Sequence, residues 1–178
     1  MGIKVWVCRI CGEAYINDGK PNRCPFCGAY KKYLVEAKDY DDTGAWDVEL
    51  NEVDRANAEK ALGVEISNTL FYKCSSNKVE ELDGQKLFKI LSKVEGEHAA
   101  IWKKILKMDK IKWEPDETCE VDYKSDLEDS HFREERAIKF YIGAAIAAKS
   151  PRVKEIFEAL VEIETDHLKL SEVRLKNM

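Results

Sequence analysis

Apolar residues recur at alternating steps of three and four positions after residue 53, which is the spacing of one helix face. The run from Phe88 to Ile105 shows this most clearly, with Leu91 and Trp102 on the same face. Turn-forming residues such as Ser150 interrupt the pattern. The pattern predicts four helices, over residues 54–76, 83–108, 125–149 and 151–177. Asp54 is of a residue type that caps helix N-termini, which predicts it as the N-cap of the first helix.

The lengths of the connections indicate how the helices are arranged. Short turns near Asn77 and at Ser150 would form two antiparallel hairpins, and the longer segment 109–124 would connect the hairpins. Long crossovers of this kind occur in four-helix bundles. We therefore expect a mainly α protein with a four-helix bundle over residues 54–178, a small module over residues 1–36 and a linker over residues 37–53.

The two expected hairpins repeat the same residues at an offset of 69 positions. Apolar residues coincide, for example Phe88 with Phe157. Six of the coinciding residues are Glu or His, which are types that bind metal ions. Six such residues at equivalent positions are hard to explain by chance and favour one shared site. The coinciding polar and aromatic pairs are Glu65 and Glu134, Tyr72 and Tyr141, Glu95 and Glu164, and His98 and His167.

Two of these coincidences form Glu-x-x-His motifs, Glu95–His98 and Glu164–His167. Residues three positions apart share a helix face, so each motif directs a carboxylate and an imidazole into the bundle. Buried carboxylates are costly without a cation, and no Lys or Arg occupies the matching inward positions. Two divalent ions would balance four carboxylates, which predicts a ferritin-like metal pair. Glu95 and Glu164 would bridge the ions, and one histidine would bind each ion.

The remaining members of the repeat have supporting roles in this prediction. Glu65 and Glu134 would be the terminal carboxylate ligands, and Glu135 is a rival to Glu134 that the 69-residue offset disfavours. Tyr72 and Tyr141 lie two turns after the lone carboxylates. They could donate hydrogen bonds to ligands of the opposite half, or they could simply be core residues with satisfied hydroxyl groups.

The first 36 residues contain two Cys-x-x-Cys motifs, Cys8 with Cys11 and Cys24 with Cys27, and a glycine follows each motif. Glycine tolerates a positive φ there, so the chain can fold around an ion. Four thiolates suit tetrahedral zinc or a single iron ion, and the spacing does not choose between them. The module has too few apolar residues for a core of its own, so metal binding and folding should be coupled.

The composition limits which binding partners and which cellular compartment we expect. The net charge of −5 argues against a nucleic acid partner. No run of about eighteen apolar residues would span a membrane, and the segment before Cys8 leaves no room for a signal peptide. We therefore expect a cytoplasmic protein. Disulfides are rare in that compartment, so we expect Cys74 to be a small buried residue on a helix and Cys119 to be a loop thiol.

Together these motifs resemble the rubrerythrin family. The cysteine motifs resemble a short rubredoxin module, and the bundle residues match the family's di-iron ligands, with the module first as in reverse-order members. The resemblance implies one iron ion at the cysteine site, which receives electrons, and two iron ions in the bundle. Family members reduce hydrogen peroxide to water with electrons from a reductase. They are typically dimers or larger oligomers, and in several of them the cysteine site of one subunit serves the di-iron site of another.

One position departs from the family pattern. Peroxidase-type members carry a further Glu one turn after the lone Glu of the third helix, where this chain has Ala137; the equivalent residue of the first helix is Asn68. The leading expectation is a peroxidase-type oxidoreductase. The departure keeps two alternatives open: an oxidase or ferroxidase that reacts with dioxygen, with manganese as a possible substitute for iron, and a non-catalytic metal-binding protein with a structural zinc ribbon.

Overall fold

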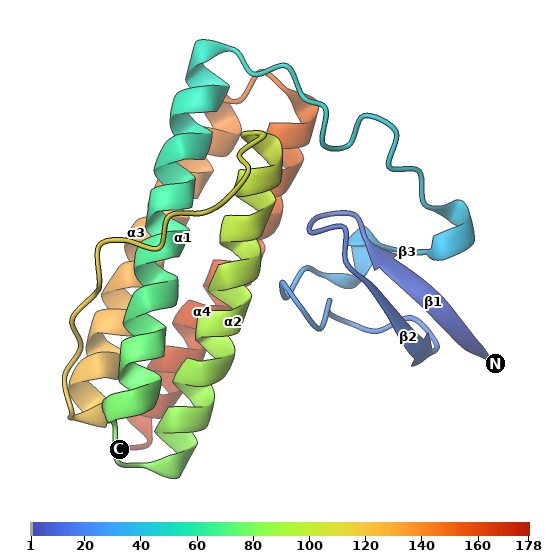
Figure 1. Ribbon diagram of the computed structural model, residues 1–178. Coiled ribbons are helices and arrows are strands. Elements are labelled where there is room, and N and C mark those ends of the chain that lie inside the picture. The colour runs from blue at the N-terminus through green and yellow to red at the C-terminus, as the bar shows by residue number, and fades with distance from the viewer. Residues whose placement is uncertain (1) are drawn as a thin grey trace.

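The computed structural model describes residues 2–178 and consists of a four-helix bundle with a small β module at its side (Figure 1). The helices lie side by side along the bundle axis. This arrangement confirms the expected fold class, a mainly α ferritin-like bundle with a small N-terminal module. The helices are α1 (Glu52–Lys78), α2 (Leu82–Ile105), α3 (Tyr123–Ala147) and α4 (Pro151–Lys176).

The connection between the hairpins runs along the whole bundle. The segment 106–122 leaves the end of α2 and passes outside α1 to reach the start of α3 at the opposite end (Figure 1). As a result α1 and α3 are antiparallel neighbours. This geometry brings the two copies of the repeated sequence together around a pseudo-twofold axis, and it supplies the long crossover that the sequence predicts.

The start of α1 differs from the prediction. Asn51, not Asp54, is the N-cap, and its Oδ1 accepts hydrogen bonds from Val53 N at 2.9 Å and from Asp54 N at 3.0 Å. Asp54 is instead fully buried and accepts from the backbone N–H groups of Lys149 at 3.0 Å and Ser150 at 2.9 Å. This carboxylate therefore ties the start of the first hairpin to the turn of the second.

The N-terminal module is built on a three-stranded antiparallel sheet with strand order β2-β1-β3. The third strand, which the sequence pattern did not reveal, is only three residues long and pairs Trp6 with Glu36. Short 3-10 turns, η1 (Lys31–Tyr33) and η2 (Ala37–Asp39), flank it. The strands are β1 (Ile3–Cys8), β2 (Ala14–Asp18) and β3 (Leu34–Glu36).

Cys74 and Cys119 form a disulfide, so the expectation of two separate thiols is wrong. The crossover carries Cys119 alongside α1, and the two Cα atoms are 5.9 Å apart although 45 positions separate the residues in sequence. Lys78 reinforces the same attachment by donating from Nζ to the Cys119 carbonyl at 3.0 Å. The crossover is thus fixed covalently to the helix that it passes.

The bundle core is aromatic on both sides of its polar centre. Trp102 packs on Phe157 with ring centroids 4.5 Å apart, and Tyr72 stacks on Phe88 at 5.9 Å. These layers close the centre of the bundle above and below. Among the residues that the structure describes, no helix combines the length and the apolar character needed to cross a membrane.

Candidate metal centres

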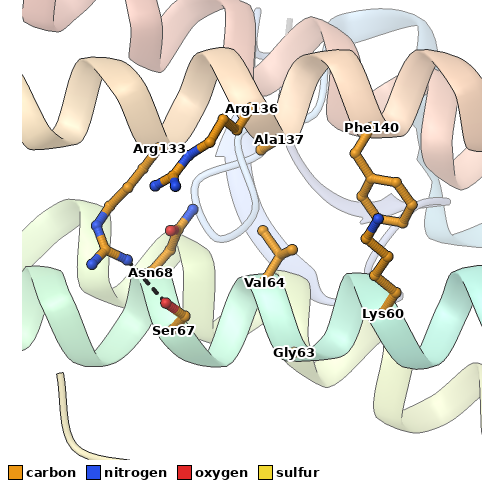
Figure 2. A pocket seen from close by; sticks show the side chains of 9 residues that line it. All are labelled: Lys60, Gly63, Val64, Ser67, Asn68, Arg133, Arg136, Ala137 and Phe140. Atoms are coloured by element: carbon orange, nitrogen blue, oxygen red, sulfur yellow. Dashed lines mark hydrogen bonds between the residues drawn. The ribbon is translucent and has the colours of Figure 1, made fainter.

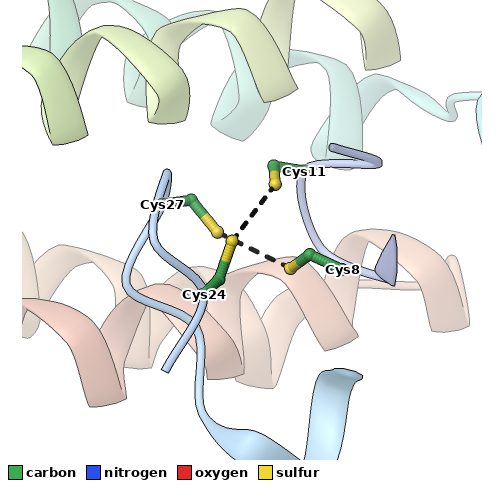
Figure 3. Close-up of side chains that lie close together, drawn as sticks. All are labelled: Cys8, Cys11, Cys24 and Cys27. Carbon is green, nitrogen blue, oxygen red and sulfur yellow. Dashed lines mark hydrogen bonds between the residues drawn. The ribbon is translucent and has the colours of Figure 1, made fainter. Parts of the chain in front are cut away.

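The four cysteines of the module converge on one point (Figure 3). Each Cys-x-x-Cys turn closes with a hydrogen bond from the following glycine, Gly12 N to Cys8 O at 2.8 Å and Gly28 N to Cys24 O at 3.1 Å. Both glycines have a positive φ, 83° and 77°, so the turns need residues without a Cβ. The sequence explains these turns directly.

The spacing of the sulfur atoms fits a tetrahedral ion. The Sγ atoms of Cys8 and Cys27 are 3.7 Å apart, and those of Cys11 and Cys24 are 3.8 Å apart. Zinc–thiolate bonds of about 2.3 Å would separate neighbouring sulfurs of a tetrahedron by about 3.8 Å. Neighbouring sulfurs, Cys11 first, and burial together raise the pKa of the Cys27 thiol. Four ionised thiolates at this distance therefore need a cation between them.

The second cluster lies in the middle of the bundle and draws side chains from all four helices. Two sets of four residues each place one ligand atom per residue within 4.8 Å of the others. Glu95 and Glu164 belong to both sets, which is the geometry that bridging carboxylates require. The sets are Glu65, Glu95, His98 and Glu164, and Glu95, Glu134, Glu164 and His167.

The cluster contains buried polar atoms that the protein does not satisfy. In the part of the chain that the structure describes, Glu65 Oε2, Glu134 Oε2 and both carboxylate oxygens of Glu164 have no hydrogen-bond partner. Glu95 Oε1 and His167 Nδ1 also have no hydrogen-bond partner among the described residues. Unsatisfied buried carboxylate oxygens are costly, and a pair of cations would satisfy all of these atoms. The donor set of four carboxylates and two imidazoles fits a non-haem iron or manganese pair.

The electrostatics of the cluster point the same way. Burial, with the neighbouring Glu95 and Glu164, raises the pKa of Glu65 and Glu134 well above that of an ordinary carboxyl. Burial opposes charge on His98 too, but Glu164 and Glu65 outweigh it and raise the imidazole pKa. Without metal, the site therefore binds protons, and metal ions would replace these protons when they bind.

The two tyrosines of the repeat contact the lone carboxylates across the bundle. Tyr141 donates from its hydroxyl group to Glu65 Oε1 at 2.6 Å, and Tyr72 donates to Glu134 Oε1. Both hydroxyl groups are fully buried, and burial together with the adjacent carboxylate raises each tyrosine pKa. The tyrosines therefore stay protonated and orient the carboxylates from behind.

The structure also separates Glu134 from its rival. Glu134 is fully buried, whereas Glu135 is exposed to solvent. Ala137 and Asn68 lie one turn after the lone carboxylates and are buried beside the cluster. Neither offers a carboxylate, so the cluster has six candidate ligands rather than seven.

A hydrogen bond joins the two centres directly. His98 Nε2 lies 2.9 Å from the carbonyl oxygen of Cys27, while His98 Nδ1 faces Glu164 at 3.2 Å. With Nε2 as the donor, one imidazole connects a cysteine of the module to the carboxylate cluster. Sequence analysis missed this contact because no spacing relates residues of separate modules.

Cationic side chains of α2 and α4 hold the module in this position. Lys104 donates from Nζ to the Cys11 carbonyl at 2.7 Å, and Arg152 donates from Nη2 to the Arg9 carbonyl at 2.7 Å. The ring of Trp46, in the segment before α1, lies 4.9 Å from each of these cations. The linker aromatic thus packs between the module and the bundle.

A four-helix bundle with a central carboxylate–histidine cluster, joined to a four-cysteine module, defines the ferritin-like class of metal proteins. A family model described as Rubrerythrin matches residues 57–170. A second, described as the rubredoxin-like domain of rubrerythrin, matches residues 6–34. Neither a search of curated proteins nor a search of solved structures found a match. The chain belongs to the rubrerythrin family, whose members are generally oxidoreductases, and it carries the rubredoxin-like domain at its N-terminus.

Proposed function

We propose that this protein reduces hydrogen peroxide to water, with electrons that arrive through the cysteine site. The hydrogen bond between His98 and the Cys27 carbonyl is the observation that supports this most strongly. A structural zinc site would gain nothing from a direct bond to a ligand of a second metal cluster. An electron-transfer site would benefit, because the contact keeps the two centres close together.

The residues present fit iron at both places. Cys8, Cys11, Cys24 and Cys27 would hold one ion with no open position, which suits electron transfer rather than bond chemistry. The carboxylate–histidine cluster would hold two ions, with Glu95 and Glu164 shared between them. When bound in the ferrous state, the pair supplies the two electrons that convert one peroxide molecule and two protons into two water molecules.

The side chains around the pair control water and protons. Glu65 and Glu134 are fully buried, and Tyr141 and Tyr72 each hold a proton against one oxygen of these carboxylates. His167 remains 11% exposed, so this half of the cluster is nearer to solvent than the half at His98. We infer that protons reach the cluster from the His167 side, while electrons reach it from the His98 side.

We propose that electrons pass between the two centres of the same chain. The route runs from Cys27 through its carbonyl oxygen to Nε2 of His98 and ends at the ligand cluster. This differs from relatives in which the cysteine site serves another subunit. We expect a cytoplasmic reductase to reduce the cysteine site, and a homodimer or larger oligomer as the assembled form.

A second candidate function is an oxidase or ferroxidase that reacts mainly with dioxygen. Ala137 favours it, because the small side chain leaves the cluster without a seventh carboxylate beside Glu134. Manganese at the same six ligands would be a further variant of this function.

Stopped-flow mixing separates the candidates. The iron-loaded protein is reduced without oxygen and mixed with equal concentrations of hydrogen peroxide or dioxygen, while absorbance follows the cysteine site. We expect faster oxidation by peroxide. Equal or faster oxidation by dioxygen would contradict this proposal and support the oxidase or ferroxidase function instead. Metal analysis runs in parallel: zinc in the cysteine site and no ferric–thiolate absorbance would remove the electron route altogether.

A further inference from the structure

The bundle face between α1 and α3 is hollowed by a cavity of about 460 Å³, which no role described so far uses (Figure 2). Asn68 of α1 and Ala137 of α3 form its inner part, and both are almost fully buried. Lys60 and Arg136 lie at its exposed part. The module contacts α2 and α4, so this cavity opens on a different face of the cluster.

The 69-residue repeat fixes where the cavity lies. Asn68 and Ala137 are equivalent positions, each one turn after a lone carboxylate. The helices are antiparallel, and tyrosine–carboxylate bonds cross between them on both sides of these two residues. The inner end of the cavity therefore faces the midpoint of the cluster, between its two halves.

Two cations of the cavity have no acidic partner among residues 2–178. Lys60 Nζ lies 4.3 Å from the centre of the Phe140 ring, and Arg136 Nε donates to the Phe132 carbonyl at 3.2 Å. Arg133, also in the cavity wall, is instead paired with Glu117 at 3.2 Å. Lys60 lies at the Phe140 end of the cavity, and Arg136 lies beside Asn68 (Figure 2), so Arg136 is the cation that an anion at the inner end would contact.

Asn68 adds an independent indication. Its side chain is 3% exposed, and within the described part of the chain its Nδ2 has no hydrogen-bond partner. An unsatisfied buried N–H costs free energy, and a ligand that accepts a hydrogen bond would remove that cost. The amide points into the cavity toward Arg136 (Figure 2).

We propose that this cavity binds a small oxyanion. One oxygen accepts a hydrogen bond from Asn68 Nδ2, Arg136 balances the charge, and Ala137 leaves the space that the anion occupies. The anion is a carboxylate such as formate or an inorganic anion such as phosphate. If the proposed function is right, the bound anion and the oxidant compete for the same opening.

Calorimetric titration of the iron-loaded protein tests the site, with sodium formate in one arm and sodium phosphate in the other at constant ionic strength. We expect saturable binding of one equivalent in at least one arm. Arg136→Gln removes a charged donor and Asn68→Leu removes the amide at similar volume. Each substitution should weaken binding by about tenfold, as expected for loss of a charge-assisted or buried hydrogen bond. Because no oxidant is present, the result does not depend on peroxide turnover.

Lys110→Gln is the matched control, since it removes one exposed lysine of the crossover segment that does not line the cavity and changes the net charge equally. Its affinity should stay within about twofold of the parent protein. Formate binding alone identifies a carboxylate ligand, phosphate binding alone an inorganic one, and either supports the site. No saturable binding in either arm, or undiminished binding by Arg136→Gln, overturns it. Cysteine-site absorbance and melting temperature show whether each variant is folded. If Asn68→Leu does not fold, the binding measured for Arg136→Gln decides whether the site exists.

Discussion

Replacing Tyr141 by Phe should weaken the metal pair by removing one hydroxyl group. That group donates to Glu65 Oε1 at 2.6 Å, and both residues are fully buried, so water cannot replace it. The other carboxylate oxygen of Glu65 has no protein partner among the described residues. A hydrogen bond to a buried charged group contributes about 1.5–3 kcal/mol. Metal affinity should therefore fall by about 10- to 100-fold.

The repeat provides a second variant for comparison. Tyr72→Phe removes the equivalent bond to Glu134, but the Tyr72 hydroxyl also contacts Ser130 Oγ at 2.9 Å. The position equivalent to Ser130 in the other half is Ala61, which has no hydroxyl group. After substitution, Ser130 is available close to the orphaned carboxylate. We therefore expect Tyr72→Phe to cost less metal affinity than Tyr141→Phe.

Competition with a chelator of known affinity at fixed pH measures the loss, and melting temperature with and without metal measures its effect on the fold. Tyr123→Phe is the control, because Tyr123 is also on α3 but its hydroxyl group contacts Arg174 at 2.8 Å rather than a candidate ligand. If Tyr141→Phe and Tyr72→Phe both bind metal within about threefold of the parent protein, the tyrosines do not support the site.

Three other changes test separate parts of the structure. Cys74→Ser opens a link that spans 45 positions, and loop entropy predicts a loss of at most about 4 kcal/mol in unfolding free energy, measured by denaturant titration against the parent protein with the disulfide intact. The reduced parent protein should match the variant. Gly28→Ala would place a Cβ 3.2 Å from Ile163 Cγ2, at a residue whose φ is 77°. The substitution should therefore displace the module from the bundle. In stopped flow, re-reduction of the bundle site should become slower, while the cluster keeps its iron. Removal of metal should invert the pH dependence of stability. The raised pKa values of Glu65 and Glu134 give the metal-free bundle stability that is present below about pH 4.5 and lost as pH rises through those values, whereas metal needs deprotonated ligands. The increase in melting temperature on iron binding should therefore grow from about pH 5 to about pH 8, and an increase that shrinks would contradict the assignment.

Sequence alone predicted the parts of this protein that depend on periodicity. The 3.6-residue repeat of a helix fixes which side chains share a face, so the inward positions of Glu95 and His98 followed from spacing. The 69-residue offset then chose Glu134 over Glu135, and the structure places the first in the core and the second in solvent. The four-helix fold followed from the same pattern.

Features that depend on contacts between distant segments were not predictable. Nothing in the spacing of Cys74 and Cys119 shows that the crossover passes beside α1. The polar residue Asp54 matched a cap by type, but packing against the second hairpin decided its role. The bond from His98 to Cys27 likewise depends on how the module docks on the bundle. Charged side chains of two different helices fix that docking together.

That docking has a consequence for how the protein works at low abundance. If the cysteine site passes electrons to the bundle cluster as proposed, donor and acceptor belong to one polypeptide, and their encounter frequency is set by the fold and does not fall on dilution. Turnover per molecule, once the module is charged with an electron, should be the same in a sparse solution as in a crowded one. Only the recharging of the module by the reductase would then depend on concentration.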